Sequence, residues 1–165
     1  MWILSAIVRL VAILILFRVA VIDVRYRRLP TGMIGFLGAL FFIEALIIGM
    51  PIRDLLSHLL IAIFAIVVGA ILFALGLVGG GDAKLASVIF LWVGLSVALP
   101  ALTLICVAGL GISLISIATR HIIPEHRSRL MRTLAMFSVA RGVPYGVALA
   151  LGGVPLIVMP LYSVR

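Results

Sequence analysis

Two of the five acidic residues in this chain stand where a carboxyl group could do chemistry. Asp23 closes a long apolar stretch, in VIDVR, and Asp82 closes a glycine run, in GGGDAKL. A carboxylate at membrane depth is costly and needs a partner or a function. If two carboxyls share one proton, the ionised one can take a proton from water while the protonated one hydrogen-bonds a scissile carbonyl. The two residues are candidates for such a dyad.

The glycines before Asp82 fit this chemistry. A peptide backbone must approach the dyad closely, and side chains at Gly79, Gly80 and Gly81 would block it. A Gly-rich loop is tolerated at this depth where it lines a cavity. Two purely structural interpretations compete with the dyad: Asp82 as the N-cap of the next helix, and Asp23 as the neutralising partner of the arginines that follow it.

The composition indicates what must position these residues. Of the 165 residues, 65% are apolar and 11% charged, and the mean hydropathy is +1.44. A soluble domain is about half apolar and about a quarter charged, and its surface must face water. We therefore expect an all-α integral membrane protein that forms one domain over 1–165 without a soluble insert. The single cysteine, Cys106, excludes an internal disulfide framework and a CxxC-type zinc site.

At roughly 20 apolar residues per spanning helix, the chain can hold about six transmembrane helices, the Gly-rich loop preceding the fourth. The expected spans are 2–22, 31–49, 57–76, 83–99, 101–119 and 143–161. We expect a tight turn at Leu99-Pro100, where the fourth and fifth spans meet. Arg9 and Arg18 interrupt the first span, which therefore does not read as a cleavable signal peptide.

The basic residues predict the orientation. Nine Lys and Arg lie on the odd-numbered connections, two on the even side and two inside the first span. By the positive-inside rule the odd connections are cytoplasmic and both termini lie outside the cytoplasm. Asp23 and Asp82 then lie level, at the cytoplasmic ends of their spans. The net charge of +8 is explained by this topology and by anionic lipid headgroups, so we expect no nucleic-acid partner.

Depth within the membrane predicts the partner of another acid. Glu44 lies about 8 Å and Arg9 about 10 Å from the outer ends of antiparallel neighbouring spans, at about 1.5 Å per residue. We predict a buried Glu44–Arg9 ion pair, with a proton relay through Glu44 as the alternative. Asp54, beside Arg53, is expected to be solvated in an outer loop.

Two further patterns have structural explanations. Glu125 lies in HIIPEH at 121–126, which is not the HxxEH spacing of a metal site, and Pro124 would break the helix that such a site needs. His58 lies at the opposite face, so we expect no metal and no cofactor. The small residues Gly142, Gly146, Ala148 and Gly152 predict close helix packing.

The two Asp segments together resemble the type IV prepilin peptidases, the GxGD aspartic proteases of the bacterial inner membrane. Gly79, Gly81 and Asp82 fill GxGD, and the following residues extend the match to GxGDxKL. Asp23 stands seven residues before Pro30, as in the I-D-x6-P pattern of the family. LWVG at 91–94 and VPYGVA at 143–148 also resemble family segments.

The resemblance implies that Asp23 and Asp82 are the catalytic pair, near the cytoplasmic face of a multi-pass protein. It implies that Gly79, Gly80 and Gly81 shape the active-site loop, and that Lys84 either tunes Asp82 or anchors the chain to the cytoplasmic side. The implied substrate is a prepilin or pseudopilin whose short basic leader lies in the cytoplasm.

Two departures refine the resemblance. Thr31 replaces the Asn or Asp that usually follows the proline. The chain also lacks the soluble insert with paired cysteines of the long, bifunctional members, which implies a peptidase without N-methyltransferase activity. Its size is similar to the short Tad/Flp-pilus (CpaA- or TadV-like) subgroup.

Three alternatives stay open at this point. A small transporter or channel subunit could use the same acids for cations or protons. A GxGD peptidase could instead process preflagellin-like proteins or signal-peptide remnants. A serine intramembrane protease is disfavoured because the chain has no GxSxG motif.

Overall fold

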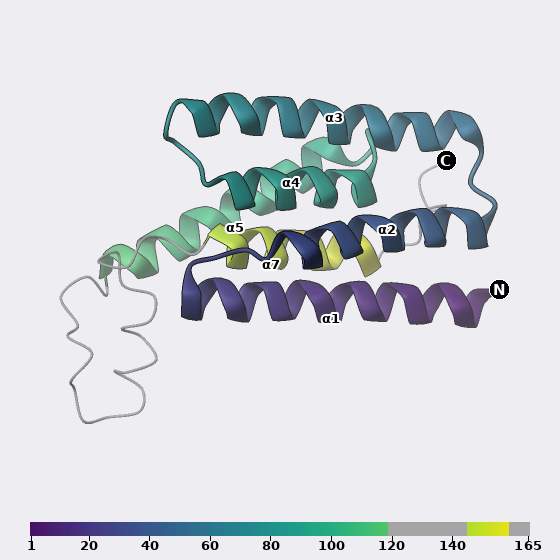
Figure 1. Cartoon of the computed structure of the whole chain (residues 1–165), viewed down its shortest axis with the longest axis horizontal. Coiled ribbons are helices and arrows are strands. Elements are labelled where there is room, and N and C mark those ends of the chain that lie inside the picture. The colour runs from purple at the N-terminus through teal and green to yellow at the C-terminus, as the bar shows by residue number, and fades with distance from the viewer. Residues whose placement is uncertain (119–144, 159–165) are drawn as a thin grey trace.

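The computed structural model describes residues 1–118 and 145–158. Within these ranges the regular secondary structure is all helical (Figure 1). The helices are α1 (Trp2–Tyr26), α2 (Thr31–Ile48), α3 (Ile52–Ala74), α4 (Gly80–Val93), α5 (Ala98–Ala118) and α7 (Tyr145–Val158). The whole basic fifth connection, with the HIIPEH segment, and Gly142 lie outside the described residues.

Four of the described helices, α1, α2, α3 and α5, are long and apolar enough to cross a membrane. Only 17% of the most apolar window is buried in α3, and the same share in α5. Large apolar side chains such as Leu60, Phe64 and Leu110 are therefore exposed. Exposed apolar surface on helices of this length is typical of a membrane protein. The prediction of an all-α membrane protein is confirmed, whereas six spans and the direction of the termini stay predictions.

The boundary between the fourth and fifth helices differs from the predicted one. We predicted the break at Leu99-Pro100, but α4 already ends at Val93 and α5 begins at Ala98. Gly94 ends α4 with φ 74° and ψ 171°, a backbone conformation that is essentially restricted to glycine. Pro100 lies in the first turn of α5, where the missing N–H of proline has no intrahelical acceptor to lose.

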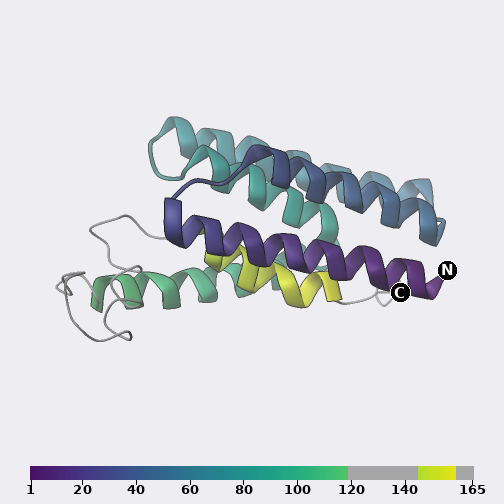
Figure 2. The ribbon, with the colours of Figure 1, turned by 60° about the horizontal axis from the view of Figure 1, so that its bottom comes forward.

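The inner helices of the bundle are α4 and α7. α7 packs against α1, α4 and α5, and α4 packs against α2, α3 and α7 (Figures 1 and 2). Small residues permit this closeness, since a Cβ on Gly69 of α3 would lie 2.7 Å from the Ala83 Cβ of α4. A Cβ on Gly152, one of the small residues expected at a helix interface, would lie 3.0 Å from the backbone nitrogen of Ile105. Close backbone approach therefore sets the positions of α3 and α5 on the inner pair.

The LWVG segment holds the far end of α4. Trp92 is buried, and its indole Nε1 donates a hydrogen bond of 3.0 Å to the Leu37 carbonyl of α2. Phe41 packs edge-on against Trp92 and stacks on the buried His58 ring, which lies 2.8 Å from the Leu91 carbonyl through Nδ1. These contacts hold the C-terminal end of α4 between α2 and α3. Because a helix is rigid, they also help to position its first turn.

The predicted ion pair between α1 and α2 is confirmed. Arg9 Nη2 lies 2.7 Å from Glu44 Oε1, and Arg9 Nε donates to the same oxygen at 2.8 Å. The Ser5 hydroxyl donates a third bond of 2.6 Å to this oxygen, and Glu44 is fully buried. Asp54 was predicted in a loop, but it lies in the first turn of α3, where a negative charge is favourable next to the helix N-terminus.

Candidate active site

Asp23 and Asp82 lie at the same end of the bundle. Asp23 is in the last turn of α1 and Asp82 in the first turn of α4. The end of α1 and the starts of α4 and α7 lie together in both ribbon views (Figures 1 and 2). The two carboxyls are near enough for the charge of Asp23 to act on Asp82. The structure therefore brings together the two acids that the sequence singled out.

Leu29 occupies the space between the elements that carry the two acids. A Cβ on Gly81, the residue before Asp82, would lie 2.9 Å from the Leu29 Cβ. A Cβ on Gly146, the residue bonded to Asp23, would lie 3.0 Å from the Leu29 Cδ2. One leucine side chain thus contacts both glycines, and the segment between α1 and α2 borders the site.

Asp23 is held by the first turn of α7. Its carboxyl is 6% exposed, and Oδ2 accepts a hydrogen bond of 2.8 Å from the Gly146 backbone N–H. The N–H groups of a first helical turn have no partner within the helix and attract negative charge. Arg27, the C-cap of α1 with φ 52°, donates its own N–H to the Asp23 carbonyl at 2.8 Å, and its guanidinium also attracts the carboxylate. These contacts hold the Asp23 side chain against the first turn of α7.

Glycine is required at position 146 by the same geometry. A Cβ there would lie 2.9 Å from Asp23 Oδ2 and 3.0 Å from its Cγ. Real Cβ atoms essentially never lie within 3.0 Å of another heavy atom, so the Asp23 carboxyl would have to move. We assigned Gly146 to helix packing from its spacing, and the structure adds a direct contact with the Asp23 carboxyl.

Asp82 is not the N-cap of α4, so this structural interpretation is wrong. The N-cap is Gly79, and α4 begins at Gly80. Asp82 is the third helical residue, and its carboxylate turns back to accept a hydrogen bond from the Gly79 backbone N–H. This is the reach of an acidic residue in the first helical turn toward the N-cap amide. A Cβ on Gly79 would lie 2.7 Å from Asp82 Oδ2, so the carboxylate occupies the space of the missing side chain.

The glycine run is a loop only at its first residue. Gly79 is extended, whereas Gly80 and Gly81 are helical. A Cβ on Gly80 would lie 3.4 Å from the Phe73 ring of α3. Each of the three glycines therefore faces a different group, and their small size lets α4 begin close to α3 and Leu29.

The surroundings of Asp82 favour its protonated form. Asp82 precedes the predicted fourth span and lies outside the four helices long enough to cross a membrane. Burial and, second, the negative charge of Asp23 raise the pKa of the Asp82 carboxyl to about 6, against the opposing hydrogen bond from Gly79. Lys84 is exposed two residues further on and is not among these influences.

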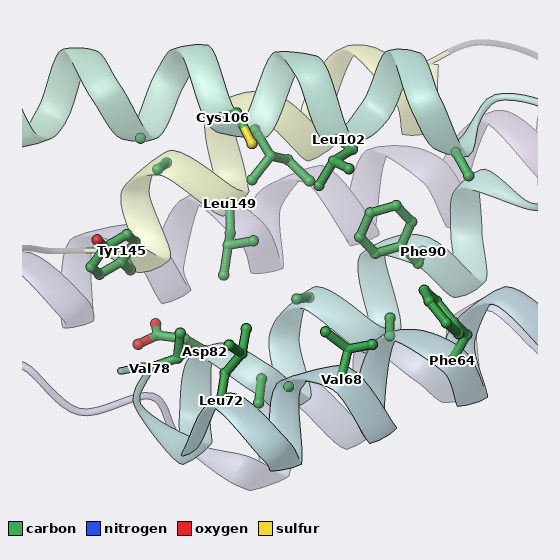
Figure 3. A pocket seen from close by; sticks show the side chains of 18 of the residues that line it. Phe64, Val68, Leu72, Val78, Asp82, Phe90, Leu102, Cys106, Tyr145 and Leu149 are labelled. Atoms are coloured by element: carbon green, nitrogen blue, oxygen red, sulfur yellow. The ribbon is translucent and has the colours of Figure 1, made fainter. Parts of the chain in front are cut away.

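A cavity of about 590 Å³ opens beside Asp82. Asp82 and Tyr145 lie at one end of it, and Phe64 and Phe90 at the other (Figure 3). α3, α4, α5 and α7 all contribute to its walls, which are almost entirely apolar. A peptide that reached Asp82 would therefore have an apolar space next to it.

Sequence reasoning missed the roles of Leu29 and Tyr145 and the contact of Gly146 with Asp23. Tyr145 and Gly146 belong to the VPYGVA stretch that resembles the family, which was the available signal. Leu29 directly precedes Pro30, but nothing in an isolated Leu-Pro pair distinguishes it from a residue of an ordinary turn. Its place between Gly81 and Gly146 follows from helix packing alone.

The fold and the site together define an all-helical membrane protein with two acidic side chains gathered at one end of the bundle. The type IV leader peptidase family model matches residues 10–114, which include both aspartates and the whole glycine run. The chain therefore belongs to the type IV leader peptidase family and is a membrane peptidase, as the resemblance implied. The searches of curated proteins and of solved structures found no match.

Proposed function

We propose that the chain is an aspartic endopeptidase of the bacterial inner membrane that removes the short cytoplasmic leader from Flp/Tad-type prepilins, without N-methyltransferase activity. The observation that carries the proposal is the gathering of Asp23 and Asp82 around Leu29. Family membership supports peptide hydrolysis. The excess of basic residues on the odd connections supports a cytoplasmic site, where the leader is expected to lie.

In this proposal the two acids have different roles. The hydrogen bond from the Gly146 backbone N–H holds the Asp23 carboxyl in one position, which suits a general base. The pKa of Asp82, raised to about 6 by burial and by the charge of Asp23, leaves a larger protonated share near neutral pH than an ordinary Asp has, which suits a general acid. Unequal environments of this kind separate the functions of two otherwise identical groups.

The reaction needs only the peptide and one water molecule. Asp23 takes a proton from water, the water oxygen bonds to the scissile carbonyl carbon, and Asp82 gives its proton to the carbonyl oxygen. The carbon–nitrogen bond of the tetrahedral intermediate then breaks. Asp23 passes its proton to the leaving amine, and Asp82 recovers a proton from the intermediate. The products are a leader with a free carboxyl group and a mature protein with a free amine.

Leader removal from a co-expressed Flp-type prepilin, followed as a gel shift, tests the proposal. Wild type is compared with Asp23→Asn and Asp82→Asn at matched membrane levels. Asp54→Asn is the control, because Asp54 is an exposed acid in the first turn of α3, at the other end of the bundle. We expect cleavage by wild type and by the control and none by either dyad variant. Cleavage by a dyad variant would refute the catalytic assignment, and an uncut prepilin with wild type would refute the substrate class.

Conservative exchange separates this proposal from a cation channel or proton carrier that uses the same acids. A relay needs a carboxyl group, whereas peptide hydrolysis also needs its position to be held closely. Asp82→Glu keeps the charge but moves the carboxyl by one methylene, away from the Gly79 amide. We expect it to lose most peptidase activity, and retention of full function would favour a relay.

A further inference from the structure

The apolar cavity beside Asp82 is a groove between two outer helices. Its walls come from α3 and α5, and its floor from the inner helices α4 and α7. Phe64, Val68 and Leu72 project from α3, and Leu102 projects from α5 (Figure 3). α3 packs mainly on α4 and α5 mainly on α7, so neither outer helix closes the groove.

The groove faces the hydrocarbon of the bilayer. α3 and α5 are both long enough to cross a membrane, and most of their surface is exposed. Apart from the Asp82 and Tyr145 end, Ser113 and Cys106 carry the few polar atoms of the side chains that line it. An occupant that arrives sideways from the bilayer must therefore be apolar along its length.

The length of the groove corresponds to a helical segment. Its lining on α5 runs from Ala98 to Ser113, which at about 1.5 Å per residue is about 22 Å. An extended chain of the same length would leave its backbone N–H and C=O groups without partners in an apolar environment, whereas a helix satisfies its own. The dimensions and the polarity thus select an apolar helix.

We infer that this groove binds one face of the apolar helix that directly follows the scissile bond of the substrate. The inference rests on the proposed function and identifies the part of the substrate that the enzyme recognises. The groove is continuous with the site because Asp82 is one of its lining residues. A helix that lies in the groove would present the peptide bond at its N-terminal end to that carboxyl. A lipid acyl chain is the competing occupant.

The register of the bound helix can be worked out from α7. Gly146 contacts the Asp23 carboxyl, and Gly152, six residues later, contacts the backbone of Ile105. Six helical residues rise by about 9 Å. Cys106 lines the groove one residue nearer the acids than Ile105, because α5 runs antiparallel to α7, and is therefore about 7–8 Å further along the bundle than the acids. A substrate helix brings the residue about five positions after the scissile bond level with Cys106.

Disulfide cross-linking to Cys106 tests this register, since the chain has no other cysteine. Single cysteines are placed at successive positions after the scissile bond of a cysteine-free prepilin. The partner is the otherwise intact Asp23→Asn variant, which keeps the substrate uncut. We expect the strongest cross-link about five positions after the scissile bond and a weaker one about one helical turn later. A yield that is uniform along the substrate would overturn the inference.

Moving the cysteine supplies the matched control. In Cys106→Ser combined with Leu104→Cys, the thiol leaves a groove-lining position for an exposed position of α5 that does not line the groove. We expect the cross-link to disappear in this variant. Equal cross-linking from both positions would show that the substrate contacts the lipid-facing surface without a groove, and would overturn the inference.

Filling the groove supplies a second, kinetic test. Leu102 and Leu104 lie on the same helix with similar exposure, 47% and 44%, but only Leu102 lines the groove. We expect Leu102→Trp to raise KM for the full-length prepilin about tenfold, about 1.4 kcal/mol, and Leu104→Trp to leave it unchanged. A short peptide that ends soon after the scissile bond should be cut equally by both. An unchanged KM for Leu102→Trp favours a lipid occupant and overturns the inference.

Failure of the two proposals gives different results. If wild type cuts the prepilin but Cys106 forms no position-dependent cross-link, the groove assignment is wrong and the peptidase proposal stands. If wild type does not cut the prepilin, the proposed substrate class is wrong and the inference about its helix falls with it.

Discussion

The exchange Gly146→Ala is the smallest change that perturbs the Asp23 carboxyl. The new Cβ would lie 2.9 Å from Asp23 Oδ2 and 3.0 Å from Cγ, where ordinary contacts begin at 3.4 Å. The carboxyl must therefore retreat by about half an ångström, as the difference between these distances shows. The Leu29 Cδ2 lies 3.0 Å from the same new Cβ, so the methyl group is crowded from that side as well.

The cost of this exchange has two parts. The hydrogen bond from the Gly146 N–H to Oδ2, now 2.8 Å, lengthens or breaks. A hydrogen bond to a charged group contributes about 1.5–3 kcal/mol. A misplacement of about 1 Å in an active site costs roughly a hundredfold in rate, so half of that displacement predicts a loss of roughly tenfold or more. We expect this loss in kcat, because the groove that would hold the substrate helix is not altered.

Prepilin cleavage kinetics in detergent or in vesicles measure this effect. Gly35→Ala is the control, since it adds the same methyl group within a helix, α2, at a position with no atom within 4 Å of the new Cβ. We expect the control to cut at the wild-type rate. Thermal unfolding of both variants establishes that the protein remains folded. A folded Gly146→Ala enzyme with unchanged kcat would refute the assignment of Asp23 as a base held by α7.

Two further predictions concern pH and stability. Because the proposed general acid is the protonated Asp82 carboxyl, whose pKa is raised to about 6, kcat/KM should fall as the pH rises through that value; a cleavage profile that stays level from pH 6 up to pH 8 would contradict this role. Arg9→Met should destabilise the protein by about 3–5 kcal/mol, because it leaves the fully buried Glu44 carboxylate without its cation. Thermal unfolding of Arg9→Met and of the double variant with Glu44→Met measures this loss. The double variant should recover most of it, and an Arg9→Met protein as stable as wild type would contradict a stabilising role of the ion pair.

Composition and spacing were enough to predict the elements that position the site. An apolar excess of this size excludes a soluble domain, and interruptions by charges and by glycine or proline mark where helices end. Depth arithmetic predicted the Glu44–Arg9 pair, because a buried charge must find an opposite one within reach and only one candidate lay level with it. These conclusions depend on local properties of the chain and on the membrane as solvent.

Helix boundaries were less predictable, for a physical reason. The start of α4 at Gly80 and its end before Gly94 depend on backbone angles that glycine permits but does not impose. Contacts with Phe73 and His58 select among the permitted conformations, since a Cβ on Gly80 would touch the Phe73 ring and a Cβ on Gly94 the His58 ring. Pro100 was taken for the break because its own preference does not reveal whether it begins a helix or precedes one.

The sequence alone determined that Asp23 ends one apolar segment, that Asp82 precedes another, and that both are expected on the basic side of the membrane. Only the tertiary structure decided what surrounds them. The Gly146 amide lies 123 positions from Asp23 along the chain and bonds to it because α7 packs antiparallel to α1. The Leu29 side chain contacts Gly81 and Gly146 because the first turns of α4 and α7 both pack against the segment between α1 and α2. No periodicity encodes such contacts, since they depend on the packing of whole helices rather than on the residues in any one of them.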